Sequence, residues 1–296
     1  MSLIQKNRIA LLFVVLSLNL TSLIAAAKIE TVIGSVALQS NDNLAGILPT
    51  TSQSEIIISR PQYVISYNKD RRTPNWVAWK LEADQLGTVG RSNNFMQDPD
   101  LETYLGRSGQ HAVDPDEYKN SCFDRGHQIP SGDRTDSAAN NEATFMMSNM
   151  IPQTAYLNRV IWEHLEQYTR DLVRKQNKKV YVIAGPVYDE NFGAIGPHQD
   201  IQVPSKDFKI IIVLDANQTA ADITTSTPVI AVIMPNTTKD GSKPAILKSQ
   251  ACGNDESVDA VDADTNDWQQ YETTVAQIES ISGIKLAAMQ PSRRKK

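Results

Sequence analysis

The sequence predicts an α+β fold with a mainly antiparallel central sheet flanked by helices. Five short runs are rich in β-branched and aromatic residues, as strands are: residues 63 to 67, 76 to 79, 180 to 184, 209 to 214 and 229 to 234. Residues 158 to 176 and 275 to 282 show the pattern of helices, and Gly283 ends the second one. No linker rich in glycine, serine or proline and no internal repeat divides the chain, so we expect one large domain. Residues 28 to 58 and 98 to 120 carry no clear pattern.

The first 27 residues have the three parts of a secretory signal peptide. Lys6 and Arg8 form a positive n-region, residues 9 to 24 are mainly apolar, and three alanines at 25 to 27 supply small residues for cleavage. A retained membrane anchor is the alternative, but the apolar run is shorter than the roughly 20 residues that span a bilayer. We therefore expect a secreted or periplasmic protein that starts near Lys28 and has no membrane contact after cleavage.

The charge of the chain does not exclude nucleic acid as a partner. Removing residues 1 to 27 takes away two basic residues and no acids, which moves the formal net charge from -5 to -7. Binding depends on the local field of a cleft rather than on bulk charge. Acids gather in residues 255 to 264, whereas the tail, residues 291 to 296, is basic. The tail could capture polyanions, or it could be a merely solvated terminus.

A motif of four residues, Asp124-Arg125-Gly126-His127, predicts phosphate-ester chemistry. Histidine is the side chain best suited to accept a proton near neutral pH, and arginine presents donors that match phosphate oxygens. We expect Gly126 to let the backbone turn sharply, so that Arg125 and His127 face one cleft. The alternative is a charged hairpin with a surface histidine, because four-residue matches also arise by chance.

Downstream segments continue the pattern of a known family. About twenty residues after the first motif comes Met147-Ser148-Asn149-Met150-Ile151-Pro152-Gln153, followed by Leu157-Asn158, Trp162 and Glu166. In this order the segments resemble the DNA/RNA non-specific endonucleases of the ββα-metal, or His-Me finger, superfamily. The resemblance implies a ββα-metal active-site hairpin and helix. We expect an unassigned extension at residues 28 to 58, before an endonuclease domain at residues 59 to 290.

The resemblance also implies roles for single residues. His127 would be the general base, and Asn158 would be the direct protein ligand of Mg²⁺, for which Mn²⁺ or another divalent cation could substitute. Arg125 and Asn149 would contact phosphate or order the site, and Glu166 would hold metal-bound water. Phosphodiester hydrolysis needs these functions: an activated water, neutralisation of the transition state and stabilisation of the departing oxygen.

Helical spacing gives a partial check on these roles. On an ideal helix, Glu166 lies about 80° from Asn158 and two turns further along, so it could reach a metal-bound water better than the metal itself. The alternative for Glu166 is an exposed helix glutamate. We expect Trp162 to pack in the core rather than to stack on substrate.

The family pattern includes a second arginine upstream of the first motif. Arg91 is the best match for it and would contact the transition state. Asn93 could occupy the position instead, and a solvated loop arginine is the other interpretation of Arg91.

The chain has two cysteines, Cys122 and Cys252, and an exported protein favours a disulfide between them. The bridge would tie the active-site hairpin to the C-terminal part of the chain. The sequence leaves open whether the two Cα atoms come within about 7 Å of each other. We do not expect a zinc site, because the cysteines and histidines lack the paired spacing of structural zinc motifs.

Together these observations predict a secreted, Mg²⁺-dependent, sugar-nonspecific endonuclease with DNA and RNA as substrates. Two alternatives remain: a catalytically inactive nucleic-acid-binding protein on the same fold, and an exported phosphodiesterase that acts on small substrates. The combination of His127, Asn158 and Arg125 favours the endonuclease.

Overall fold

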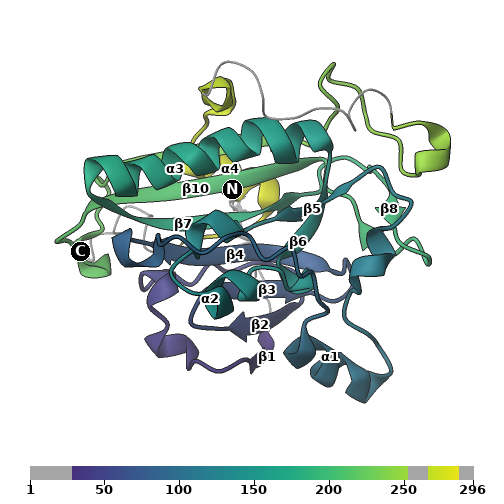
Figure 1. Cartoon of the computed structure of the whole chain (residues 1–296), viewed down its shortest axis with the longest axis horizontal. Helices are drawn as coiled ribbons and strands as arrows, with labels where there is room; N and C mark the ends of the chain where they lie inside the picture. The colour runs from purple at the N-terminus through teal and green to yellow at the C-terminus, as the bar shows by residue number, and fades with distance from the viewer. Residues whose placement is uncertain (1–28, 253–265, 287–296) are drawn as a thin grey trace, which may run out of the picture.

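The computed structural model describes residues 29–252 and 266–286. At its centre lies a seven-stranded sheet in the order β1-β2-β3-β4-β7-β10-β11 (Figure 1). β1 pairs with β2 in parallel, and all the other neighbours in this sheet are antiparallel. The strands of the sheet are β1 (Ile29–Ile33), β2 (Glu55–Ser59), β3 (Val64–Asn68), β4 (Thr73–Leu81), β7 (Lys178–Val187), β10 (Lys206–Asp215) and β11 (Val229–Pro235).

Two small hairpins and four α-helices accompany this sheet in the described part of the chain, with short 3-10 helices and one π-helical turn between them. The hairpins are β5 (Asp124–His127) with β6 (Met150–Gln153), and β8 (Ala194–Ile195) with β9 (Ile201–Gln202). The helices are α1 (Pro99–Leu105), α2 (Ala138–Ala143), α3 (Trp162–Gln176) and α4 (Val275–Ser282). This confirms the predicted α+β fold class, its mainly antiparallel sheet and both predicted helices.

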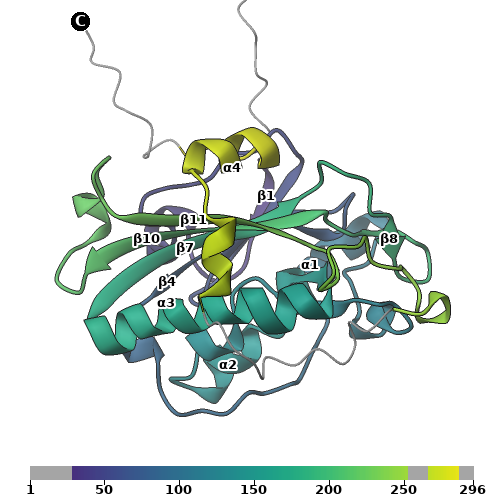
Figure 2. The ribbon, with the colours of Figure 1, turned by 90° about the horizontal axis from the view of Figure 1, so that it is seen from above.

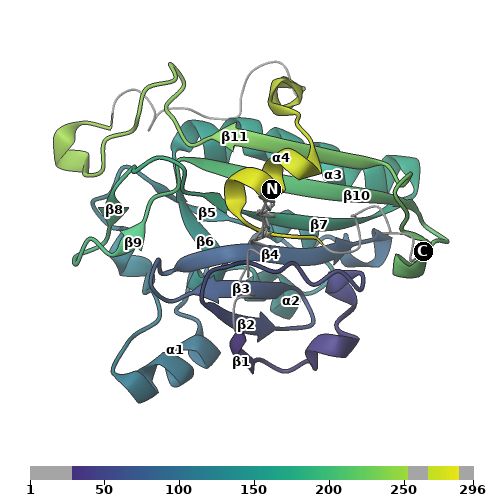
Figure 3. The same cartoon turned by 180° about the vertical axis from the view of Figure 1, so that it is seen from behind.

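The two faces of the sheet belong to separate hydrophobic cores, because successive side chains of a strand point to opposite faces. On β2, for example, Ile56 and Ile58 enter one core and Ile57 enters the other. The long helix α3 covers the first face and α4 covers the second, as Figure 2 shows from above. Figure 3 shows α4 from behind, lying across the strands. Trp162 belongs to the first core with 1% of its surface exposed, which confirms that it packs in the core.

The five predicted strands are all present; four are longer than their apolar runs, and β3 is shifted by one residue to Val64–Asn68. Residues 28 to 58, which carried no clear pattern, contribute β1 and all of β2 except its last residue, Ser59, to the same sheet as the rest. The loop after Asp98 contains α1, whose first turn is capped by the Asp98 side chain.

Three expectations fall outside the described residues: the signal peptide, the acidic segment at 255 to 264 and the basic tail. Within residues 29–252 and 266–286, no helix has the length and apolar character needed to cross a bilayer.

Candidate active site

The first motif forms strand β5, which pairs with β6 so that Gly126 lies opposite Ile151 and His127 opposite Met150. Gly126 lies in this extended strand and does not make the sharp turn that we expected. Glycine is needed there for another reason: a Cβ atom would come within 2.1 Å of Oε1 of Gln153. Gln153 cannot easily move, because it is fully buried and its Nε2 donates to Asp207 at 2.6 Å. A close approach between strands therefore explains this glycine.

A single turn of π-helix, Leu157–Ile161, carries Asn158 and leads directly into α3. In this turn the N–H of Trp162 donates to the carbonyl of Leu157, five residues back. Such turns are rare and occur frequently at functional sites, because the extra residue re-aims the side chains of one helical turn. The ideal helical angles between Asn158 and Glu166 therefore do not apply at the start of this helix.

The Asp124 carboxylate joins this turn to the hairpin. It accepts a hydrogen bond from Nδ2 of Asn158 at 2.9 Å and two from the Arg159 guanidinium, each at 2.7 Å. Nε1 of Trp162 adds a bond at 3.3 Å to the carbonyl oxygen of His127. Strand β5 and the start of α3 are thus held in a fixed register. The sequence patterns assigned no role in the site to Asp124 or Arg159. Asp124 is nevertheless part of the first motif, and Arg159 directly follows Asn158.

His127 is buried, with 6% of its surface exposed, so it is not the surface histidine of the alternative interpretation. Its ring packs edge-on against Phe145, with centroids 4.8 Å apart, and against Phe95 at 5.6 Å. Burial, together with the nearby charge of Arg91, lowers the pKa of His127 from 6.5 to about 3. The imidazole is therefore neutral at physiological pH. Its Nε2 has no hydrogen-bond partner within the described part of the chain.

Two arginines lie over the aromatic rings that surround His127. The Arg125 guanidinium lies 4.6 Å from the centroid of Phe95, and that of Arg91 lies 4.9 Å from the centroid of Phe145. Arg91 also donates to Oγ of Ser131 at 3.0 Å and to Oδ1 of Asn93 at 2.8 Å. Asn93 thus orients Arg91, and Arg91 itself lines the cleft.

Asn149 is fully buried and lies beneath the site rather than in its cleft. Its Nδ2 donates to the carbonyls of Ile129 and Thr144, at 3.0 and 2.9 Å, and its Oδ1 accepts from the N–H of Ile129 at 3.1 Å. These three bonds use most of the capacity of the amide, so Asn149 is arranged to order the backbone that follows β5.

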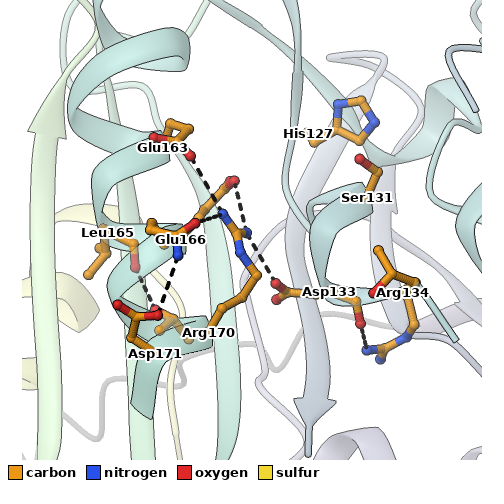
Figure 4. Close-up of polar contacts among 12 residues, drawn as sticks. His127, Ser131, Asp133, Arg134, Glu163, Leu165, Glu166, Arg170 and Asp171 are labelled. Atoms are coloured by element: carbon orange, nitrogen blue, oxygen red, sulfur yellow. Dashed lines mark hydrogen bonds and ion pairs between the residues drawn. The ribbon is translucent and has the colours of Figure 1, made fainter. Parts of the chain in front are cut away.

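Glu166 points into a buried group of charges instead of lying on an exposed face. Its carboxylate lies 3.7 Å from Nζ of Lys209 and 3.8 Å from Nη1 of Arg170, and 11% of its side chain is exposed. Burial raises the pKa of Glu166 to about 7, although both cations oppose that rise. Figure 4 shows the Arg170 guanidinium between Glu166, Glu163 and Asp133.

Lys209 is the most deeply buried cation of this group, with 1% of its surface exposed. Its ammonium lies 3.9 Å from the centroid of the Trp162 ring, close enough for a cation–π interaction. Lys209 comes from β10, far along the chain from the motifs. Sequence reasoning therefore missed it, reading residues 209 to 214 only as a strand.

Asp124, Arg125, Asn158 and Arg91 line one cleft of about 630 Å³. Asn158 suits a hard cation there, because its amide nitrogen is turned to Asp124 and its amide oxygen is left for another partner. His127 and Glu166 do not line this cleft but are buried close to it. The arrangement combines a neutral imidazole, an oxygen donor for a cation and guanidinium groups for an anion.

The predicted disulfide between Cys122 and Cys252 is confirmed, with Cα atoms 5.3 Å apart. It ties the chain immediately before β5 to the C-terminal part.

A hairpin that carries a buried histidine thus packs across the start of a helix that presents an amide. The chain belongs to the DNA/RNA non-specific endonuclease family, whose sequence model matches residues 39–292. It is therefore a nuclease that hydrolyses phosphodiester bonds, in a family that depends on a divalent metal ion.

Several curated proteins are similar to this chain. A nuclease from Nostoc sp. is 36% identical over 245 residues, which cover 81% of this chain and 77% of that protein. A nuclease from Serratia marcescens is 30% identical over 60% of this chain and 65% of its own length. Human mitochondrial endonuclease G is 31% identical over 52% of this chain and 53% of its own length. Among solved structures, a chain in the crystal structure of the EndoG/EndoGI complex shares the fold, with a TM-score of 0.58 and 23% identity over 79% of this chain and 86% of that one.

Proposed function

We propose that this protein is an exported, Mg²⁺-dependent endonuclease that cuts DNA and RNA with little regard for sugar or sequence. His127 acts as the general base and Asn158 as the direct protein ligand of the metal. The observation that carries the proposal is the Asp124 carboxylate, which binds the nitrogen of Asn158 and leaves its oxygen for a cation. Asp124 is three residues from His127 in the same strand, so both groups have fixed positions.

The state of His127 supports its role. An imidazole that is neutral at physiological pH can accept a proton, and its Nε2 is the ring nitrogen that lacks a partner in the described structure. The packing of Phe95 and Phe145 holds the ring in place. In this proposal His127 takes a proton from the water that attacks phosphorus.

The cations of the cleft would bind the phosphate anion of the substrate. Arg125 and Arg91 are each held over an aromatic ring, which keeps their guanidinium groups in place. In the proposal they contact the phosphate, where negative charge grows in the transition state. A bound divalent ion would stabilise the departing oxygen as a Lewis acid. Glu166 would orient water near that ion, held in position by Lys209 and Arg170.

Export rests on the sequence of residues 1 to 27, with its basic, apolar and small-residue parts. Edman sequencing of protein recovered outside the cytoplasm should begin near Lys28. Full-length protein retained in the cell would contradict this part of the proposal.

Nicking of supercoiled plasmid by the purified protein tests the proposed chemistry. We expect cleavage in Mg²⁺, none after chelation, and a loss of at least 10²-fold in kcat for His127→Ala, because general-base catalysis contributes about 10²–10⁴-fold. A parallel assay with a chromogenic small diester separates the alternatives. Cleavage of the small diester with plasmid left intact would indicate a small-substrate phosphodiesterase, and binding without cleavage would indicate an inactive binding protein.

A further inference from the structure

A short segment near residue 250 is fastened beside the active-site hairpin. Residues 246–252, here called the tethered segment, end at Cys252, which is bonded to Cys122. The N–H of Cys122 donates to the carbonyl of Ile246, and the N–H of Lys248 donates to the carbonyl of Asn120, both at 3.0 Å. Because Cys122 lies two residues before β5, the tethered segment has a fixed place relative to the catalytic motif.

The tethered segment presents Lys248 to the cleft. Lys248 begins a short helix, Lys248–Gln250, and its side chain lines the cleft that contains Asn158 and Arg125. It also lines a neighbouring cavity of about 290 Å³, to which Arg159 contributes. The two cavities share Ser121, Phe123, Asp124 and Lys248. Lys248 therefore lies where the catalytic cleft continues into a second cavity.

The described residues that line both cavities carry mainly positive charge, although the whole chain is acidic. Arg91, Lys119, Arg125, Arg159 and Lys248 line one cavity or both. Asp124 is the one acid among the described residues that line them, and its carboxylate already accepts bonds from Arg159 and Asn158. A continuous groove of this kind matches a chain of phosphates rather than a single one.

We propose that Lys248 binds a phosphate of the substrate backbone next to the scissile one, and that the Cys122–Cys252 disulfide holds it there. The ligand is a phosphodiester strand of DNA or RNA, bound through its charge and without reading its bases. This inference rests on the proposed function, and it adds a binding subsite and gives the disulfide a role in substrate affinity.

The competing explanation is an ordinary solvated lysine on an exposed turn. Position favours the subsite, because backbone hydrogen bonds and the disulfide fix the main chain on both sides of Lys248. A lysine that only improved solubility would not need such a support.

The salt dependence of binding distinguishes the two explanations. Each phosphate contact contributes about 0.9 to the slope of log K against log salt for duplex DNA, and about 0.7 for single strands. We expect Lys248→Ala to lower that slope by about one such unit and to raise KM several-fold while kcat stays close to that of the wild type. Binding is measured by fluorescence anisotropy in a His127→Ala background, which prevents cleavage.

Lys175→Ala is the matched control. Lys175 is also an exposed lysine, paired with Asp171 at 2.8 Å, but it lies near the far end of α3, about 25 Å along the helix from Asn158. The control loses the same charge and should keep the wild-type slope. If Lys248→Ala and Lys175→Ala have equal slopes and equal KM values, the subsite does not exist.

The disulfide is tested by the double variant Cys122→Ser, Cys252→Ser, checked for folding by circular dichroism. We expect the double variant to lower the slope of log K against log salt as much as Lys248→Ala does. Adding Lys248→Ala to the double variant should then lower the slope no further. Additive losses would show that the disulfide does not position Lys248, and Lys248→Ala tests the subsite even if the double variant does not fold. Failure of the proposed function looks different, because the wild type itself would then leave plasmid uncut.

Discussion

The depressed pKa of His127 has a measurable effect on stability. The folded protein keeps this imidazole neutral down to about pH 3, whereas its ordinary pKa in the unfolded chain is 6.5. Between these values the unfolded chain binds a proton that the native state does not bind. The native state therefore loses stability as the pH falls from 6.5, by up to about 1.4 kcal/mol for each pH unit.

The assay compares the wild type with His127→Ala by urea unfolding at several pH values from 7 to 4. The variant leaves a cavity, whose cost does not depend on pH, and it lacks the titrating group. We expect the stability advantage of the wild type to be constant above pH 6.5 and to shrink by about 1.4 kcal/mol per unit below pH 6. A difference that stays constant from pH 7 to 4 would refute this account of His127.

Proton NMR gives an independent reading of the same quantity. The chain contains four histidines, and the His127→Ala spectrum identifies the signal that belongs to this one. We expect that signal not to titrate above pH 5. A midpoint near pH 6.5 would mean that the ring is solvated. By the same reasoning, protonation of His127 should not cause a loss of activity near pH 6.5.

Three further predictions concern the metal ligand, the buried charges and the hairpin. Asn158→Ala should lose both metal affinity and rate in Mn²⁺ titrations, while Asn158→Asp should keep or improve affinity and still cleave poorly, because its charge repels phosphate; an unchanged Asn158→Ala would refute the ligand role. Lys209→Met should lower the free energy of unfolding by about 3–5 kcal/mol, because it removes one partner of a buried ion pair and leaves the Glu166 carboxylate less compensated. It should lower activity and move the pH–rate profile upward, because Lys209 holds down the pKa of Glu166; an unchanged profile would contradict that coupling. Gly126→Ala should cost about 1–3 kcal/mol of stability through overpacking against Gln153. Gly106→Ala, where an added Cβ meets nothing within 4 Å, is the control and should be nearly neutral; equal stabilities would contradict the close approach.

Local patterns in the sequence were sufficient to predict much of the fold. The strands were predictable because apolar β-branched runs stay buried on both faces, as with Ile210, Ile211 and Ile212. The end of α4 was predictable because Gly283 adopts φ of 77°, which favours glycine. Residues 28 to 58 gave no clear pattern, and their two strands depend on pairing with partners elsewhere in the sheet.

The site was predictable where its residues lie in contiguous motifs and unpredictable where distant segments meet. Arg125, His127 and Asn158 come from such motifs: Arg125 and Asn158 line one cleft, and His127 is buried close to it. The contact of Glu166 with Lys209 joins residues 43 positions apart, and no local period indicates it. The reason for Gly126 was also hidden, because it depends on the side chain of Gln153 across the hairpin. The π-turn at Asn158 likewise departs from the ideal helix that sequence spacing assumes.

Parallel digestion of matched DNA and RNA, as duplexes and as single strands, tests the central claim most directly. In the proposed function, the residues that line the cleft bind phosphate and metal, which both nucleic acids share, and no group there is assigned to the 2′-hydroxyl. We predict that the wild type cuts both sugars at rates within about a hundredfold, equivalent to about 2.7 kcal/mol, and that chelation or His127→Ala abolishes both activities together. A preference beyond a hundredfold for one sugar, or loss of only one activity in His127→Ala, would contradict a single sugar-nonspecific site.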